Sequence, residues 1–182
     1  QASRFGTEVK MDCMVTKISQ IDGGFEISWD DLYQGSSESA QFKTVIIATG
    51  ASARHLGIDG EDQYFDGSGN YAGVTACATC DGALPIFRNQ EVAVIGGGDT
   101  AMEEALFMTK FASKVYVVHR RDDFRTSKIM GDRVKNHEKI EVLWNKTVAA
   151  YIDTDKKLSG LTLADTQTGE QSELAVKGCF LA

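Results

Sequence analysis

The chain has 182 residues, of which 42% are hydrophobic and 25% are charged, and its formal net charge is -7. This composition is typical of an ordinary folded protein with one or two domains. The acidic balance argues against nucleic acid or an anionic membrane as a partner, and no apolar run approaches the ~20 residues that a membrane-spanning helix needs.

The first part of the chain predicts β-structure. Hydrophobic and polar residues alternate over residues 9–15 and again over residues 25–29, on either side of a turn at residues 22–24. Residues 30–40 are polar and predict a loop. The continuous apolar run at residues 42–48 predicts a strand buried on both faces.

Small residues follow that run. At Thr49 and Gly50 the backbone can pass close to a ligand or to a neighbouring strand. Residues 57–73 are rich in Gly, Asp and Asn, and they predict a linker and surface loop.

From residue 91 the pattern changes to alternating strands and helices. Apolar runs at residues 92–95, 115–118 and 140–143 predict buried strands. Helices are expected between them, the first with an apolar stripe over residues 101–108 and Asp99 or Thr100 as its cap, and the second at about residues 127–134. This order predicts an α/β fold with a parallel sheet of the Rossmann type.

The last part of the chain predicts an antiparallel β-meander that covers the parallel sheet. Its strands are expected at residues 149–153, 158–163 and 173–176, with polar turns between them. Residues 178–182 then enter another buried strand and stop inside it. We therefore expect the chain to be part of a longer protein.

A glycine-rich turn separates the first strand and the first helix of the Rossmann-like region. Its sequence, Gly96-Gly97-Gly98-Asp99-Thr100-Ala101, matches the dinucleotide-binding pattern G-x-G-x-x-A. The first glycine permits a tight turn, the second lets a pyrophosphate approach the backbone, and the alanine lets helix and strand pack closely. A plain glycine turn is the alternative, and the strand before it and the helix after it favour the nucleotide.

Basic residues follow the second strand of this region. An NAD site usually has Asp or Glu there, about 20 residues after the glycines, to accept a hydrogen bond from the ribose 2′-hydroxyl. This chain has His119, Arg120 and Arg121, and then Arg125. Because arginine binds phosphate with two hydrogen bonds, the pattern favours NADPH, which carries a 2′-phosphate. A solvated basic turn is the alternative.

Only two of the four cysteines are close in sequence: Cys77 and Cys80 form C-x-x-C, and Cys13 and Cys179 are isolated. This usage does not fit a secreted scaffold held together by disulfides, and it favours a reducing compartment, with the cytoplasm as the expected location and a mitochondrial or plastid form as alternatives. Cys13 and Cys179 are expected to be small core residues.

The C-x-x-C pair favours a redox-active disulfide, since it closes a small ring. Asp81 follows the second thiol and could exchange a proton with it, although a turn or capping aspartate is an alternative role. Two inert thiols and half of a zinc site are the other interpretations of the pair, and no metal is expected because no second pair of ligands is evident.

Together, these residues resemble the low-molecular-weight NADPH-dependent thioredoxin reductases. The resemblance covers nearly the whole chain. Its landmarks are residues 48–54, the segment 76–82 around C-x-x-C, residues 87–89, residues 92–101 and the arginine-rich segment 119–125.

The resemblance implies two domains, with residues 1–73 as the middle of an FAD-binding domain and residues 74–182 as an NADPH-binding domain. It implies FAD as a second cofactor, with contacts from Val15, Thr49 and Gly50. Electrons would pass from NADPH to FAD, then to the disulfide between Cys77 and Cys80, and then to thioredoxin.

In that scheme Cys80 faces the flavin, Cys77 attacks thioredoxin and Asp81 is the acid, and the full-length enzyme is expected to be a homodimer. A sister flavoprotein that reduces peroxiredoxin-type peroxidases usually has an acidic residue where Arg120 stands. That flavoprotein is one alternative function, and a nucleotide-binding regulatory module without chemistry is another.

Overall fold

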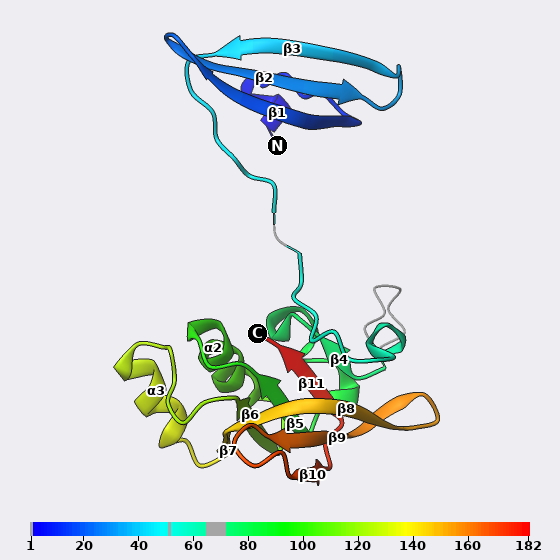
Figure 1. Cartoon of the computed structure of the whole chain (residues 1–182), viewed down its shortest axis with the longest axis vertical. Helices are drawn as coiled ribbons and strands as arrows, with labels where there is room; N and C mark the ends of the chain where they lie inside the picture. The colour runs from blue at the N-terminus through cyan, green and yellow to red at the C-terminus, as the bar shows by residue number, and fades with distance from the viewer. Residues whose placement is uncertain (1, 51, 65–71) are drawn as a thin grey trace. The chain divides into compact units, whose positions relative to one another are not determined.

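A computed structural model of the chain describes residues 2–50, 52–64 and 72–182. They form two compact units, Gln1–Ala51 and Ser52–Ala182 (Figure 1). The parallel sheet, the helices and the later meander all belong to the second unit.

The first unit is a three-stranded antiparallel sheet, preceded by a short 3-10 helix, η1 (Ala2–Phe5). Its strands are β1 (Cys13–Ile21), β2 (Gly24–Asp31) and β3 (Ser36–Phe42), in the order β1-β2-β3. The predicted turn at residues 22–24 is confirmed, since Ile21 pairs with Gly24 and Gly23 has a φ of 78°. A two-residue hairpin turn of this kind favours glycine because it requires positive φ.

Several expectations for this unit are wrong. Residues 30–40 are not one long loop, because β2 continues to Asp31 and β3 begins at Ser36. The carboxylate of Asp31 accepts hydrogen bonds from the backbone N–H groups of Tyr33 (2.9 Å) and Gln34 (2.8 Å), which closes the short turn between the two strands. The first strand begins at Cys13, so residues 9–12 lie outside it. Cys13 itself is only partly buried and is not a core residue.

The predicted buried strand at residues 42–48 is also wrong, because β3 ends at Phe42. Ile46 and Ile47 are 92% and 71% exposed, and residues 44–50 have no regular secondary structure. A strand buried on both faces needs pairing partners and covering layers, and the described residues provide neither for this segment.

The second unit is built on a five-stranded sheet in which every neighbouring pair is parallel, in the order β4-β11-β5-β6-β7. The predicted α/β class is therefore confirmed. Four of its strands match expected ones: β5 (Glu91–Ile95), β6 (Lys114–His119), β7 (Ile140–Trp144) and β11 (Gly178–Leu181). The sequence did not predict β4 (Val74–Thr75), which has only two residues.

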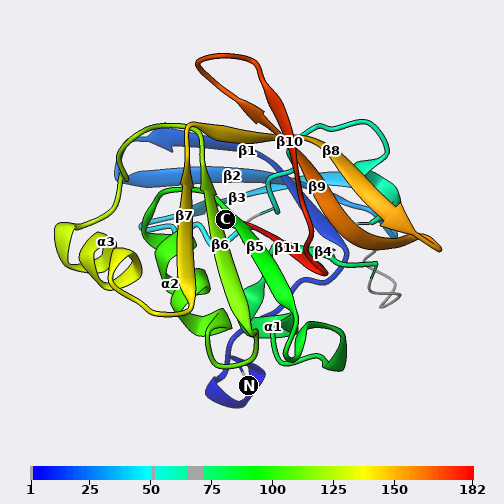
Figure 2. The same cartoon turned by 90° about the horizontal axis from the view of Figure 1, so that it is seen from below.

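Helices cover one face of this sheet (Figures 1 and 2). They are α1 (Ala78–Asp81), α2 (Asp99–Met108) and α3 (Lys128–Lys135), and a 3-10 turn, η3 (Pro85–Phe87), packs with them. The two expected helices are confirmed as α2 and α3. The expected cap is wrong, because Gly98 is the N-cap of α2 and no side chain caps it.

The antiparallel meander covers the other face, as predicted (Figure 2). Its strands are β8 (Lys146–Thr154), β9 (Lys157–Asp165) and β10 (Gln171–Leu174), in the order β10-β9-β8. Side chains along β5 alternate between the two layers: Val92 and Val94 pack with the helices, and Ala93 packs with the meander. Burial on both faces explains why β5 has a continuous apolar sequence.

The segment before β4 is more closely packed than expected. Glu61 opens a 3-10 turn, η2 (Glu61–Gln63), is only 4% exposed, and accepts a hydrogen bond from the hydroxyl of Tyr151 at 3.0 Å. Tyr64 is 3% exposed and donates to Asp153 at 2.5 Å. These contacts attach Glu61 and Tyr64 to the meander, whereas most of the other residues from 57 to 63 are exposed. The predicted surface loop is therefore confirmed in part, and residues 65–71 lie outside the described residues. No helix in the described part of the chain is long and apolar enough to span a membrane.

Candidate functional site

A cavity of about 580 Å³ lies at the carboxyl ends of three parallel strands, β11, β5 and β6. Ligands bind at this edge of open α/β sheets, and the volume is in the range of small-molecule sites. The residues that line it come from the glycine-rich turn and from four other segments: Arg54, His55, Leu56, Ile95, Gly96, Gly97, Gly98, Thr100, Ala101, Val118, His119, Arg120, Arg121, Arg125, Lys146, Thr147 and Ala182.

The glycine-rich turn forms the floor of this cavity. Gly96 has a φ of 154°, and a Cβ atom there would lie 2.9 Å from the Cβ of Ala101, which is 1% exposed. A Cβ atom on Gly97 would lie 2.2 Å from the imidazole of His119. Both glycines are therefore required by close packing within the protein, and the approach of a pyrophosphate to this turn stays a prediction. Gly98 has an ordinary φ of -96° and open space around its missing side chain.

The wall beside the turn is strongly basic. Arg120, Arg121 and Arg125 all line the cavity, and within the described residues none of the three forms an ion pair. Arg54 and Lys146 add two more cationic side chains that the sequence reasoning missed. They come from segments that only the tertiary structure brings to the cavity; Arg54 ends the landmark segment 48–54, which did not mark it as a binding residue, and no motif marks Lys146.

His119 forms part of the same wall but is a packed residue, only 6% exposed. Its ring contacts those of Phe124 and Trp144, with centroids 5.8 and 6.1 Å away. Its Nε2 lies 3.0 Å from the carbonyl oxygen of Asp123, which can only accept, so Nε2 carries a proton. Burial lowers the pKa of His119, which favours the neutral imidazole.

Asp99 does not line the cavity. Its carboxylate accepts hydrogen bonds from the hydroxyl of Thr126 and from the backbone N–H of Ser127, the latter at 3.1 Å. The backbone N–H of Arg125 donates to the carbonyl of Gly97 at 2.7 Å. Asp99 therefore fixes the arginine-bearing loop against the glycine-rich turn, and its direct contact with a nucleotide stays a prediction.

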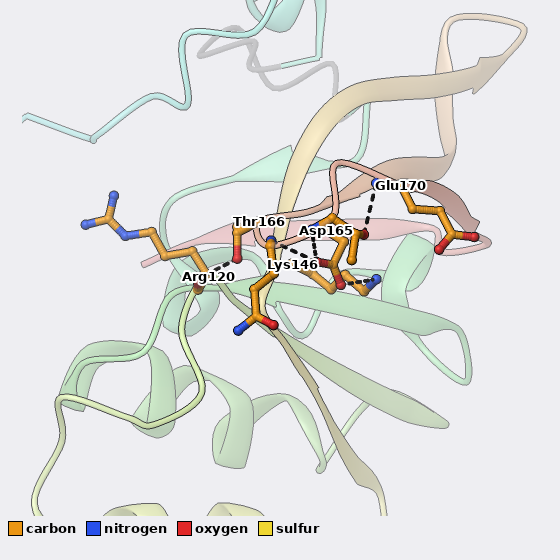
Figure 3. Close-up of polar contacts among 7 residues, drawn as sticks. Arg120, Lys146, Asp165, Thr166 and Glu170 are labelled. Carbon is orange, nitrogen blue, oxygen red and sulfur yellow. Dashed lines mark hydrogen bonds and ion pairs between the residues drawn. The ribbon is translucent and has the colours of Figure 1, made fainter.

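A second set of contacts holds the arginines from the meander side (Figure 3). The hydroxyl of Thr166 donates to the carbonyl of Arg120 at 3.2 Å, and the backbone N–H of Asn145 donates to the carbonyl of Arg121 at 3.2 Å. The turn that carries Thr166 is braced by an ion pair between Lys146 and Asp165 at 3.0 Å. Figure 3 shows the Arg120 side chain pointing away from that ion pair, so its guanidinium is not engaged by the turn.

The carboxylate of Asp165 organises this turn. It accepts hydrogen bonds from the backbone N–H groups of Thr168 (3.0 Å) and Gln167 (2.8 Å). These two bonds, together with the Lys146 ammonium, lower the pKa of Asp165 to about 2.

Cys77 and Cys80 are joined by a disulfide bond, with their Cα atoms 5.3 Å apart. Cys77 is the N-cap of α1, and its Sγ accepts a hydrogen bond from the backbone N–H of Cys80 at 3.2 Å. Cys80 is exposed and Cys77 is partly exposed. The predicted disulfide is therefore present, and an exposed disulfide of this kind can exchange with external thiols. Among the residues that the structure describes, no cluster of three His, Cys, Asp or Glu side chains could hold a metal ion.

Asp81 ends the short helix α1 beside this disulfide. Its carboxylate accepts a hydrogen bond from the hydroxyl of Thr75, whose oxygen in turn accepts from the backbone N–H of Cys77 at 3.2 Å. A chain of hydrogen bonds therefore connects Asp81 with the backbone of the first cysteine. The role of Asp81 in proton transfer stays a prediction.

The expected flavin contacts lie in the first unit. Val15 lines a hollow on its sheet, and Thr49 and Gly50 are exposed and have no regular secondary structure. Gly50 has a φ of 76°, a conformation that favours glycine, and nothing lies within 4 Å of where its Cβ would be, so the expected close approach of a ligand stays a prediction. Because Val15 lines that hollow without Thr49 or Gly50, the described residues of this unit do not by themselves build an FAD site.

Comparisons with known proteins agree with this arrangement. The chain is 43% identical over 182 residues to thioredoxin reductase from Yarrowia lipolytica and 46% identical over 184 residues to mitochondrial thioredoxin reductase 1 from Arabidopsis thaliana. It is covered completely in both cases, and it spans 54% and 47% of those proteins. The crystal structure of Lactococcus lactis thioredoxin reductase matches 92% of this chain and 51% of its own, with 40% identity and a TM-score of 0.74.

The chain thus spans about half the length of the curated relatives that it matches. The sequence pattern of the pyridine nucleotide-disulphide oxidoreductases matches residues 1–182. The relatives, the fold and the pairing of a dinucleotide turn with a disulfide agree with one another, and the chain belongs to the pyridine nucleotide-disulphide oxidoreductase family.

Proposed function

We propose that this chain is part of an NADPH-dependent thioredoxin-disulfide reductase. The observation that carries the proposal is that a basic cavity and an exposed disulfide lie on two helices that pack against each other. The start of α2 forms the floor of the cavity, and its later turns pack against α1, which carries Cys80. The relatives named thioredoxin reductase support thioredoxin as the substrate.

In this proposal the nucleotide pyrophosphate lies against residues 96–98, near the start of α2, with Thr100 and Ala101 beside it. Arg120, Arg121 and Arg125 bind the 2′-phosphate and select NADPH over NADH. Guanidinium groups suit this task because they form paired, charge-assisted hydrogen bonds to phosphate oxygens. The absence of Asp or Glu at the end of β6 removes the side chain that NAD sites use for the ribose.

The proposed FAD relays electrons from the nicotinamide to the disulfide when it is bound. Val15, Thr49 and Gly50 are the contacts that this chain would contribute to it. Once Cys77 and Cys80 are reduced, the Cys77 thiolate attacks the disulfide of thioredoxin and forms a mixed disulfide. Cys80 then displaces the reduced thioredoxin, and Asp81 supplies a proton to a leaving thiolate.

The remaining parts of the proposal concern organisation. Residues 1–73 are assigned to an FAD-binding domain and residues 74–182 to an NADPH-binding domain. A homodimer in the cytoplasm is proposed for the full-length enzyme. A mitochondrial or plastid form is the alternative, and one of the relatives is named as mitochondrial.

Trapping of a mixed disulfide tests this function. A full-length protein that carries this sequence and the change Cys80→Ser keeps the attacking thiol but cannot resolve the intermediate. It is expected to form a covalent complex with oxidised thioredoxin, seen on a non-reducing gel and mapped by mass spectrometry to Cys77. The matched variant Cys77→Ser should form none. Equal trapping by both variants, or trapping of a peroxiredoxin-type peroxidase in place of thioredoxin, would contradict the proposal.

A further inference from the structure

Glu104, on α2, is a half-buried residue whose carboxylate contacts the disulfide-bearing helix α1. Its Oε1 accepts a hydrogen bond from the backbone N–H of Ala78 at 3.3 Å. Its Oε2 is buried and has no hydrogen-bond partner among the described residues. A buried carboxylate oxygen without a partner is costly when it is charged, and burial accordingly raises the pKa of Glu104, although the Ala78 N–H opposes that effect.

The carboxylate is close to the sulfur atoms because of how α1 is packed. Ala78 is completely buried and belongs to the same core cluster as Ala105 of α2. It also follows Cys77 directly in the chain. Bond lengths and angles place the Sγ of Cys77 no more than about 5 Å from the Ala78 nitrogen. With the 3.3 Å from that nitrogen to Oε1, Sγ lies at most roughly 8 Å from the carboxylate.

Other charged groups do not balance this carboxylate. Asp81, the titratable side chain on α1, is hydrogen-bonded to Thr75. The basic residues of the neighbouring α3, Lys128, Arg133 and Lys135, form no ion pair with Glu104 in the described structure. Burial and the Ala78 N–H are the two influences on the pKa of Glu104, so its negative charge would act on the disulfide site without compensation.

We propose that Glu104 positions α1 and, through the charge of its carboxylate, sets the stability of the reduced form of the Cys77–Cys80 pair. Reduction breaks the S–S bond and adds two electrons, giving a thiolate on Cys77 and, with one proton, a thiol on Cys80. In the proposed enzyme these electrons come from NADPH, and an external dithiol can supply them equally well. When the Cys77 thiolate forms, the proton affinity of the Glu104 carboxylate rises and that of the thiolate rises with it, because two negative charges this close disfavour each other.

The size of the effect follows from the separation. Two unit charges about 8 Å apart, at the effective dielectric constant of about 20 that suits protein sites, interact strongly enough to move a pKa by about 1.5 units. The site is partly exposed, so we expect about one unit. That corresponds to about a tenfold change in the equilibrium constant for reduction, or about 30 mV in the reduction potential.

The test compares Glu104→Gln with Glu103→Gln, an exposed neighbour on the same helix, in a Cys13→Ser background that removes the partly exposed free thiol. Glutamine keeps the volume and the oxygen that accepts from Ala78. Glu104→Gln is expected to lower the pH midpoint of Cys77 alkylation by about one unit and to favour reduction about tenfold in glutathione buffers at pH 8. Glu103→Gln should leave both unchanged. Wild-type values in the Glu104→Gln variant would overturn the proposal.

A second measurement needs no substitution at Glu104. Carbon NMR of the labelled Glu104 carboxyl group, followed against pH, should give a higher pKa in the reduced protein than in the oxidised one. Equal pKa values in the two states would also overturn the proposal. The inference rests on the proposed redox role of the disulfide, but neither measurement requires flavin or thioredoxin, so its failure can be told apart from a failure of the proposed function.

Discussion

Replacement of Arg120 and Arg121 by alanine is expected to weaken NADPH binding far more than NADH binding. Both side chains line the basic cavity beside the glycine-rich turn, and within the described residues neither is neutralised by an ion pair. A hydrogen bond to a charged group contributes about 1.5–3 kcal/mol, and the lower end applies because both arginines are exposed. Loss of both therefore costs about 3 kcal/mol, or about 150-fold in the Kd for NADPH.

Fluorescence titration of the same protein with NADPH and with NADH measures this effect. The Kd for NADH divided by the Kd for NADPH should fall towards one in the double variant. In the wild-type protein the Kd for NADPH should rise with salt concentration, because salt screens exposed charges. Arg133→Ala is the control, since this exposed arginine of α3 does not line the cavity. Equal weakening of both nucleotides would refute the assignment of the arginines to the 2′-phosphate.

Three substitutions, and one measurement on the unaltered chain, test the site and its supports. Gly97→Ala puts a methyl carbon 2.2 Å from the His119 ring, so we expect a lower Tm in thermal unfolding and loss of NADPH binding. Thr166→Val removes the hydroxyl that donates to the Arg120 carbonyl and should weaken NADPH severalfold in titrations, with NADH unaffected. Asp165→Asn should lower the Tm at pH 7 but not near pH 2. The pKa of Asp165 is about 2 in the folded state and about 3.9 in the unfolded state, so its charged form stabilises the fold. That stabilisation is lost as the pH falls from about 4 to about 2. The purified 182-residue chain should retain no flavin through gel filtration.

Controls for these variants are available in the same elements. Gly98→Ala should leave the Tm unchanged, because its φ is ordinary and nothing lies within 4 Å of the added carbon. Thr168→Val alters the same turn as Thr166 without touching an arginine carbonyl, so it should not affect nucleotide selection. A similar Tm for Gly97→Ala and Gly98→Ala, or similar NADPH affinity for Thr166→Val and wild type, would contradict the structural account. A yellow protein after gel filtration would contradict the expectation about flavin.

Local patterns predicted the Rossmann-like part well because its strands and helices satisfy local rules. Residues 92–95 read as a buried strand and are one, since the helices and the meander cover both faces of β5. Residues 42–48 have the same kind of apolar sequence and form no buried strand, because the described residues supply no covering layers for them. An apolar run reports a preference for burial, and whether the segment is buried depends on the partners present.

The candidate site likewise has parts that the local sequence reveals and parts that depend on the tertiary structure. The glycine-rich turn, the C-x-x-C pair and the arginines after β6 could be identified from spacing, because each belongs to one short segment. Glu104, Lys146 and Thr166 could not, because they act across segments distant in sequence. Asp99 was identified by its position in the pattern, but its carboxylate turns away from the cavity to hold Ser127.

The measurement that tests the central claim most directly is NADPH oxidation by a flavin-loaded full-length protein carrying this sequence, with and without oxidised thioredoxin. The account predicts one NADPH consumed for each thioredoxin disulfide reduced, and loss of this thioredoxin-dependent oxidation in the Cys77→Ser variant. NADPH oxidation that does not depend on thioredoxin, or that proceeds at the wild-type rate in Cys77→Ser, would contradict it.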